Sequence, residues 1–323
     1  MGLLAFFAIL VPTVLNIALA LEAPTTSLND GNKIPILALG TYGGNGDKMR
    51  QTINWAVEAG YRHIDTASLY GNEEDIGRGI ADVIGKGLVK REDLFVTTKL
   101  WNDKHARNQV VPALKESLSR LGLSYVDLYL IHFPISSEAD GSDGYIDYLE
   151  TWQGMEDAKR QGLAKSIGVS NFNSAQIKRI IDNSQIPPAV NQIEIHPAHT
   201  REALVTKCHN MGVAVMAYSP FGFLVPRASS AAPPPQADDP TLVKIAQKYG
   251  KTTNQIVLRY LIERNVIPVP KSTNKDRLKA NIDVFDFTLT PEEVTTISKL
   301  NVNKSVFGDD EGSKNHPYYP YTE

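Results

Sequence analysis

Short apolar runs with the character of β-strands alternate with amphipathic stretches over most of this chain. The strand-like runs fall at residues 61–67, 93–100, 126–132, 164–170, 189–196, 213–219 and 265–270, with a weaker one at 283–289. Between them, apolar residues recur at helical spacing in stretches such as DKMRQTINWAVEAG and ARNQVVPALKESLSRLG. Neighbouring parallel strands need helical crossovers, so this alternation predicts a parallel sheet. Eight runs match the strand count of a (β/α)8 TIM barrel, which is the α/β fold that we expect.

Two shorter alternating runs precede the first helical stretch and flank Asp30 and Gly31, a pair that is typical of turns. They predict an N-terminal β-hairpin, and the polar residues after the last helical stretch predict a C-terminal loop. The chain has 323 residues, of which 42% are hydrophobic, so it can bury one large core. We therefore assign residues 21–323 to a single barrel domain.

An apolar leader occupies residues 1–20, and the first charged residue is Glu22. The leader closes with the small-residue pattern ALA, which is typical of a secretory signal peptide cleaved after Ala20 and predicts a secreted, extracellular protein. No Lys or Arg precedes the apolar run, and a proline and an asparagine interrupt it. Because its length approaches the ~20 residues of a membrane span, an uncleaved anchor formed by residues 1–21 stays open as the alternative.

Charge and cysteine content exclude some classes of function. Lys and Arg number 33 and Asp and Glu number 36, which gives a formal net charge of −3. Basic residues are not arranged in a stripe with aromatic residues between them, so nucleic acid is not an expected partner. Cys208 is the single cysteine, which rules out an internal disulfide, and we expect its thiol to be a small buried hydrophobic group.

Polar and potentially reactive residues stand at the carboxyl ends of the strand-like runs. They are Asp65, Lys99, His132, Ser170, Asn171, Gln192, Tyr218, Ser219, Lys271 and Ser272. In a β/α barrel these ends converge on one face, where barrel enzymes place their active sites. Their recurrence at successive strand ends favours one shared site over unrelated capping and packing roles.

Four residues form a coherent set for carbonyl chemistry. Tyr70 follows Asp65 by five residues, and with a reference pKa of about 10 a tyrosine protonates a substrate only when a cation stabilises the phenolate left behind. Lys99 can supply that charge, Asp65 can orient the ammonium, and His132 can donate a hydrogen bond to the carbonyl oxygen as negative charge develops. Taken singly, each residue also fits a turn cap, a solvated strand end, a core histidine or a packed ring. Together they predict an oxyanion and proton-donor site for the reduction of C=O.

The order of sequence motifs resembles that of the aldo-keto reductases over residues 27–323. The motifs are HIDTASLYGNEEDIG, LFVTTKLW, DLYLIHFP, IGVSNF, NQIEIHP, AYSPFG and IPVPKS followed by an arginine. The resemblance implies that Tyr70 is the proton donor and that Lys99 and Asp65 tune it. It implies that His132 binds and orients the carbonyl of a small-molecule substrate, and that the protein is a monomer.

The same resemblance implies NADPH as the cofactor. A G-x-G-x-x-G motif follows none of the strand-like runs, so a Rossmann fold is not indicated, and NADPH would lie extended across the barrel mouth. The residues assigned to it are Ser170, Asn171, Gln192, Tyr218, Ser219, Lys271, Ser272, Thr273, Arg277 and Asn281. Ser170, Asn171 and Gln192 would hold the carboxamide. Tyr218 would stack on the nicotinamide, and Ser219 with residues 220–226 would cover the pyrophosphate.

The charges assigned to the adenosine ribose distinguish NADPH from NADH. Lys271 and Arg277, with two neighbouring hydroxyls, suit a 2′-phosphate, which only NADPH carries. Many family members have a glutamate just before the residue matched by Asn281, whereas this chain has Ala280. A contact to the adenine amine is therefore expected to be missing.

Aromatic residues are predicted to surround the substrate carbonyl. Tyr42, Trp101, the loop of residues 133–145 and the tail of residues 316–323, with Tyr318, would build this wall. Such a wall favours an apolar or steroid-like ketone over a bare sugar. An export leader ahead of such a barrel resembles the secreted 3-dehydroecdysone 3β-reductases of insects, which implies a 3-keto ecdysteroid as substrate.

Two other functions stay open at this point. A general aldose or aldehyde reductase would differ only in the shape of its pocket. A non-catalytic, NADPH-binding sensor or channel-associated subunit would have no need of Tyr70. Metal catalysis at His196 and His199 is disfavoured, because the HPAH motif contains a proline and no third ligand is evident, and we expect these histidines to end a strand.

Overall fold

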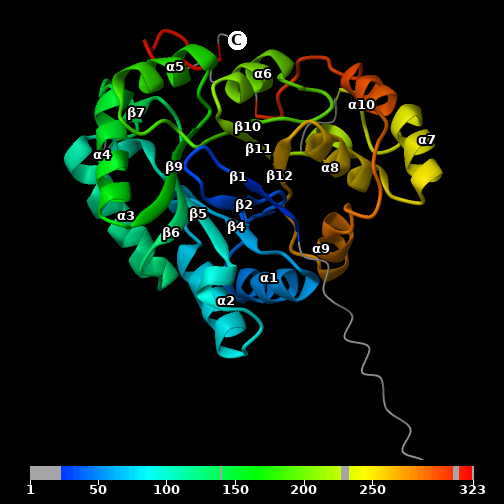
Figure 1. Cartoon of the computed structure of the whole chain (residues 1–323), viewed down its shortest axis with the longest axis horizontal. Helices are drawn as coiled ribbons and strands as arrows, with labels where there is room; N and C mark the ends of the chain where they lie inside the picture. The colour runs from blue at the N-terminus through cyan, green and yellow to red at the C-terminus, as the bar shows by residue number, and fades with distance from the viewer. Residues whose placement is uncertain (1–22, 139, 227–232, 308–312, 322–323) are drawn as a thin grey trace, which may run out of the picture.

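The computed structural model of the chain describes residues 23–138, 140–226, 233–307 and 313–321. The predicted signal peptide, residues 1–20, lies outside the described residues. Figure 1 shows a ring of helices around a central set of strands, with the C-terminal segment beside helix α5. No helix of the described residues is long and apolar enough to cross a membrane.

Eight parallel strands form one sheet in the order β3, β4, β5, β6, β9, β10, β11 and β12. They are β3 (Leu39–Gly40), β4 (His63–Asp65), β5 (Phe95–Leu100), β6 (Val126–Ile131), β9 (Ala164–Ser170), β10 (Val190–Glu194), β11 (Ala214–Tyr218) and β12 (Val266–Val269). The backbone N–H groups of Ala38 and Gly40 donate to the carbonyl oxygens of Pro268 and Pro270, both at 3.0 Å. These bonds join the first strand to the last, so the predicted (β/α)8 barrel is confirmed.

The prediction of a strand at residues 283–289 is wrong, and β3 takes the eighth place in the barrel. This segment follows a helix directly and buries Val284 and Leu289 in the layer between helices and sheet. Its backbone carbonyls accept hydrogen bonds from the neighbouring helix instead of from a strand: Gln255 Nε2 lies 2.8 Å from the oxygen of Asp283. The alternating apolar residues of this segment therefore pack against helices and do not form a strand of the sheet. β3 is only two residues long and too short to show a period of its own.

Ten helices of the described chain follow or connect the strands. They are α1 (Gly46–Ala59), α2 (Glu73–Gly85), α3 (Arg107–Leu121), α4 (Tyr148–Arg160), α5 (Ser174–Asn183), α6 (Glu202–Asn210), α7 (Pro240–Tyr249), α8 (Thr253–Glu263), α9 (Lys275–Ile282) and α10 (Pro291–Ser298). Gly250, with φ of 65°, ends α7 in the left-handed conformation that glycine adopts without strain. Thr252 then caps α8 by accepting from the N–H of Gln255, so one amphipathic stretch becomes two helices.

The predicted N-terminal hairpin is present as β1 (Thr25–Ser27) and β2 (Lys33–Pro35), which pair antiparallel. Leu28 and Ile34 of the hairpin pack with Phe95 and Leu128 in the cluster that fills the barrel interior. The hairpin thus covers the amino-terminal end of the barrel, where Phe95 begins β5. Cys208 is fully buried in α6, as predicted. The carboxyl ends of the strands face the opposite end, where the large cavity lies.

Candidate active site

A cavity of about 1030 Å³ opens at the carboxyl ends of the barrel strands. It is lined by thirteen of the residues predicted to form the site: Tyr42, Asp65, Tyr70, His132, Ser170, Asn171, Gln192, Tyr218, Ser219, Lys271, Ser272, Arg277 and Asn281. They come from segments distributed between the loop after β3 and helix α9, which follows the last strand of the barrel. The sequence prediction that strand ends share one site is therefore supported by their positions.

The proton-donor set is assembled from two neighbouring strands and one short turn of 3₁₀ helix. Asp65 ends β4, Lys99 stands near the end of β5, and Tyr70 closes the turn Ser68–Tyr70. Lys99 Nζ lies 2.6 Å from Asp65 Oδ1, 3.0 Å from the carbonyl oxygen of Thr66 and 3.4 Å from the Tyr70 hydroxyl. The lysine side chain is 0% exposed, so water does not screen its charge. The carboxylate of Asp65 balances that charge, and the ammonium also contacts the phenol of Tyr70.

Burial and charge act in opposite directions on these groups. Burial raises the pKa of the Tyr70 phenol, and the nearby Lys99 ammonium partly opposes that rise. Burial alone would lower the pKa of Lys99, but the charge of Asp65 and the contact with Tyr70 outweigh it and raise the pKa. Lys99 is therefore a cation and Tyr70 a protonated phenol at neutral pH. This is the arrangement in which a tyrosine can donate a proton and leave a stabilised phenolate.

His132 follows β6 and stands across the cavity from the turn that holds Tyr70. Its ring lies 5.8 Å from the Tyr70 ring and 5.2 Å from the Trp101 ring, both at steep angles. Burial, with a smaller contribution from the Lys99 charge, holds the pKa of His132 well below its usual value. The imidazole is neutral at neutral pH, and its Nδ1 has no hydrogen-bond partner among the described residues. A neutral imidazole can donate one hydrogen bond to a carbonyl oxygen without giving up its proton.

The residues assigned to the nicotinamide side stand at the ends of β9, β10 and β11. Asn171 Nδ2 donates to the carbonyl of His132 at 3.0 Å, and Tyr218 donates to Asn171 Oδ1 at 2.8 Å. Gln192 Nε2 donates to Asp65 Oδ2 at 2.7 Å, which ties this side to the proton-donor set. Burial raises the pKa of Tyr218 well above its usual value, so its hydroxyl remains a donor. The two halves of the site are thus one hydrogen-bonded unit.

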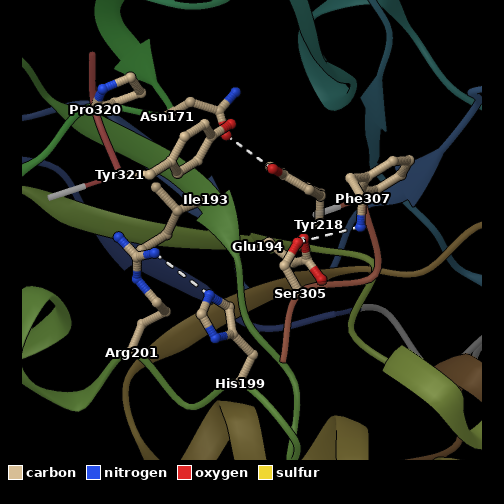
Figure 2. Close-up of a pocket in the computed structure, with 10 residues that line it drawn as sticks. All are labelled: Asn171, Ile193, Glu194, His199, Arg201, Tyr218, Ser305, Phe307, Pro320 and Tyr321. Atoms are coloured by element: carbon tan, nitrogen blue, oxygen red, sulfur yellow. Dashed lines mark hydrogen bonds between the residues drawn. The ribbon is translucent and has the colours of Figure 1, made fainter. Parts of the chain in front are cut away.

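A small second cavity lies behind Tyr218, between the barrel and the C-terminal segment (Figure 2). Glu194, at the end of β10, accepts hydrogen bonds from Ser305 Oγ and from the N–H of Val306, both at 2.6 Å. The next residue, Phe307, places its ring 5.9 Å from the Tyr218 ring. The Glu194 carboxylate therefore fixes residues 305–307 against the ring of Tyr218, which is predicted to stack on the nicotinamide.

Four predicted residues do not line the large cavity, and the first of them, Lys99, lies behind Tyr70 in contact with its hydroxyl. Trp101 lies behind the cavity lining, where its ring packs against the lining residues His132 and Phe133. Thr273 is half-buried beside the cavity wall and does not line it. The expectation that Tyr318 faces the substrate is wrong, because its ring packs on Tyr148.

The sequence analysis missed Leu69 and Phe307, which line the cavity; Tyr321, which also lines it, belongs to the tail of residues 316–323 that was predicted to form a wall. Leu69 stands beside Tyr70 in the same turn. An apolar side chain next to a reactive residue was the one sequence feature that could have indicated a place in the cavity wall. Phe307 and Tyr321 lie in irregular backbone, where no periodicity indicates which side chain faces inward. The roles of individual cofactor and substrate residues stay predictions, whereas their location at the cavity is a property of the fold.

The two histidines that were considered as metal ligands have other partners. His196 Nε2 donates to Glu194 Oε1 at 2.8 Å, and Arg201 Nη1 lies 3.3 Å from His199 Nε2. The backbones of His196 and His199 form a short antiparallel bridge just after β10. Across the part of the chain that the structure describes, no group of three or more His, Cys, Asp and Glu residues is arranged to hold a metal ion.

Comparison with known proteins agrees with this geometry. A profile of the Aldo/keto reductase family matches residues 37–302. Aldo-keto reductase AKR2E4 of Bombyx mori is 60% identical over 94% of this chain and 100% of its own, and aldo-keto reductase family 1 member A1 of Mus musculus is 39% identical over 94% and 99%. The crystal structure of Bombyx mori AKR2E4 in complex with NADP superposes with a TM-score of 0.90, covering 93% of this chain and 99% of that one. The structure of aldo-keto reductase AKR2E5 complexed with NADPH is 42% identical, with a TM-score of 0.89 over 93% and 94% of the two chains. The chain belongs to the aldo-keto reductase family, whose members are NADP(H)-dependent oxidoreductases.

Proposed function

We propose that this aldo-keto reductase uses NADPH to reduce a bulky, apolar ketone or aldehyde to the alcohol, with a 3-keto ecdysteroid as the first candidate substrate. NADPH-dependent carbonyl reduction follows from the family, and the choice of a bulky apolar substrate is our proposal. The observation that carries it is a cavity with an apolar rim that is lined by Tyr70 and His132, with buried Lys99 in contact with the Tyr70 hydroxyl.

The reduction requires one hydride and one proton. Bound NADPH supplies the hydride. Tyr70 donates its hydroxyl proton to the carbonyl oxygen, and Lys99 stabilises the phenolate that remains. Asp65 keeps the ammonium in place, and neutral His132 donates a hydrogen bond to the same carbonyl oxygen, which fixes its position as negative charge develops.

The residues on the cofactor side fit a dinucleotide. The cavity volume of about 1030 Å³ lies at the upper end of the roughly 300–1000 Å³ that ligand pockets span, so it leaves room for a cofactor as well as a substrate. Lys271 and Arg277 stand together in the cavity wall, and Arg277 Nε lies 3.3 Å from Ser272 Oγ. Two cations beside a hydroxyl suit the 2′-phosphate of NADPH, and the N-terminal end of α9 adds a favourable dipole there.

The rim on the substrate side supports an apolar substrate. Tyr42, Leu69 and Phe307 line the cavity and remain 58%, 44% and 59% exposed, which is unusual for large apolar side chains. The charged groups among the described lining residues are Asp65, Lys271 and Arg277, and all of them belong to the proton-donor set or the cofactor side. The substrate side therefore lacks a described charged group for a sugar acid or a phosphate, and it favours burial of apolar surface.

A general aldehyde reductase is the second candidate, because the proton-donor set contacts only the carbonyl group and would serve any aldehyde that enters. A non-catalytic NADPH-binding role is disfavoured, because a binding module has no use for a buried lysine directed at a tyrosine. We also propose that residues 1–20 direct export and are removed after Ala20. The support for export is the apolar leader, and the N-terminal sequence of the protein secreted from insect cells tests it against a retained membrane anchor.

The deciding experiment follows NADPH consumption by residues 21–323 with an aromatic aldehyde, a pentose and a 3-keto ecdysteroid. We expect the highest kcat/KM for the ecdysteroid and the lowest for the pentose. A clear preference for the aldehyde or the pentose would leave a general carbonyl reductase. Turnover of none of them, with NADPH still bound, would contradict carbonyl reduction and support the sensor role.

A further inference from the structure

The last described segment of the chain, residues 313–321, docks through a buried histidine. His316 is only 6% exposed, and its Nε2 lies 2.8 Å from the carbonyl oxygen of Gly144, which is 172 positions earlier in the sequence. Its Nδ1 accepts a hydrogen bond from the N–H of Tyr318 at 3.1 Å. A carbonyl needs a donor and an N–H needs an acceptor, so the two contacts require the neutral imidazole with its hydrogen on Nε2.

Gly144 belongs to a small hairpin formed by β7 (Ser136–Ser137) and β8 (Asp143–Gly144). The tail makes further contacts with it: the Tyr145 ring stacks on the imidazole with a centroid distance of 5.1 Å and an angle of 15°. Ser313 Oγ also donates to Asp143 Oδ1 at 3.1 Å. Among these contacts, the bond from His316 to Gly144 is the one that joins a buried side chain to the hairpin backbone.

Both partners continue into walls of the active-site cavity. Phe133 lines the cavity three residues before the hairpin, and Tyr321 lines it five residues after His316. Between His316 and Tyr321, the tail is fixed to the N-terminal end of α5, where Gln176 Nε2 lies 2.8 Å from the carbonyl oxygen of Tyr318. Figure 1 shows the C-terminal segment beside α5 at this edge of the barrel. The two walls have no sequence continuity, so side-chain bonds such as that of His316 set their spacing.

We infer that His316 is a positioning residue that ties the hairpin wall to the C-terminal wall and thereby sets the affinity for bulky carbonyl substrates. The inference rests on the proposed reductase function and adds to it a determinant of substrate size. A small aldehyde needs only the floor of the cavity, where Tyr70 and His132 lie. A bulky ketone also contacts both walls, so it loses affinity when their spacing is no longer fixed.

The two imidazole contacts can be separated by substitution. In His316→Gln the side-chain amide can donate to Gly144 in place of Nε2, whereas in His316→Asn the amide oxygen can accept from Tyr318 in place of Nδ1. Both variants lose the ring that stacks on Tyr145, so they form a matched pair. His209→Asn, at a half-buried position of α6 that does not line the cavity, controls for the chemical change itself.

We expect His316→Asn to raise KM for the 3-keto ecdysteroid roughly tenfold, the effect of one buried hydrogen bond, with kcat little changed. His316→Gln should stay within about threefold of the unmodified protein, and KM for an aromatic aldehyde should change in neither variant. Equal KM values in the Gln and Asn variants would overturn the inference, because the bond between the walls would then have no separate effect.

Amide hydrogen exchange gives a second reading that needs no substrate. We expect faster exchange at residues 143–146 in His316→Asn than in His316→Gln, since only the Asn variant loses the bond to the hairpin backbone. Unchanged exchange in His316→Asn would refute the coupling even if the ecdysteroid were not turned over. If the unmodified protein turned over neither the aldehyde nor the ecdysteroid, the proposed function itself would be contradicted. A failure of the inference about His316 is therefore distinguishable from a failure of the proposed function.

Discussion

Replacement of Tyr70 by phenylalanine tests the assigned proton donor at a single atom. The hydroxyl makes one hydrogen bond in the described structure, the 3.4 Å contact with Lys99 Nζ. After its removal the ammonium keeps Asp65 and the carbonyl of Thr66, so no buried charge loses its partner. The free energy of unfolding should therefore change by no more than about 1 kcal/mol.

The effect on the reaction should be far larger than the effect on stability. A positioned general acid contributes about 10²–10⁴ in rate, or roughly 3–5 kcal/mol of transition-state stabilisation. Nothing described nearby can replace it: the pKa of His132 is held well below its usual value, so at neutral pH it is a neutral imidazole whose N–H is far too weak an acid to protonate the substrate, and Lys99 is enclosed beneath the phenol. We expect kcat for an aromatic aldehyde to fall at least 100-fold in Tyr70→Phe, with the Kd for NADPH within about threefold.

Steady-state NADPH consumption measures the first quantity, and the change in protein fluorescence on titration with NADPH measures the second. Tyr125→Phe is the matched control, because it removes a phenol hydroxyl at the opposite end of the barrel, just before β6. A kcat within tenfold of the unmodified enzyme in Tyr70→Phe would refute the assignment of the donor. A large loss of NADPH affinity would show instead that the phenol contributes to cofactor binding.

The remaining predictions concern the pH dependence of the reaction, the charges of Lys99 and Lys271, and the bond that Ser305 donates to Glu194. Reduction needs the protonated phenol and burial raises its pKa, so kcat/KM should be level through neutral pH and fall only as pH rises through that raised pKa; a fall between pH 6 and 8 would contradict this. Lys99→Met should destabilise the fold by about 3–5 kcal/mol in urea unfolding because it leaves Asp65 buried and unpaired, and adding Asp65→Leu should restore most of that loss. Lys271→Met should raise KM for NADPH more than KM for NADH, and equal increases would remove the argument for a 2′-phosphate site. Ser305→Ala removes one of the hydrogen bonds to Glu194 and should raise KM for the ecdysteroid while kcat for a small aldehyde stays the same; no change in KM would show that the remaining bonds suffice.

The predicted catalytic residues reached their places because the barrel topology brings strand ends together. Asp65 and Lys99 belong to neighbouring parallel strands, in which Asp65 pairs with Thr97, so the order of the chain alone makes them close. His132 follows the next strand of the same sheet. A periodic pattern that fixes the fold therefore also fixes which strand-end side chains can meet, and this part of the site could be predicted from sequence.

The walls of the cavity could not be predicted in the same way. The tail presents three tyrosines within four residues, and the structure directs Tyr321 to the cavity and Tyr318 to α4. Irregular backbone has no period that assigns alternate side chains to one face, and the choice depends on contacts such as Gln176 with the carbonyl of Tyr318. The false strand at 283–289 has a different cause: the apolar residues do alternate there, but they pack against helices instead of forming part of a sheet.

The buried pair of Asp65 and Lys99 shows how the fold and the reaction depend on each other. A buried ion pair is commonly no more stabilising than apolar residues of the same volume, so stability alone gives little reason to place one at the end of the barrel. The pair has two further contacts that stability does not require: Lys99 reaches the Tyr70 hydroxyl, and the second carboxylate oxygen accepts from Gln192 on the cofactor side. Each oxygen of Asp65 thus serves one half of the reaction, one through the proton donor and one through the nicotinamide side. The Lys99 ammonium, which stabilises the phenolate, and Gln192, a predicted cofactor ligand, are both held by the carboxylate of Asp65. A change at Asp65 should therefore disturb proton donation and cofactor binding together. A change at Tyr70 should disturb only proton donation.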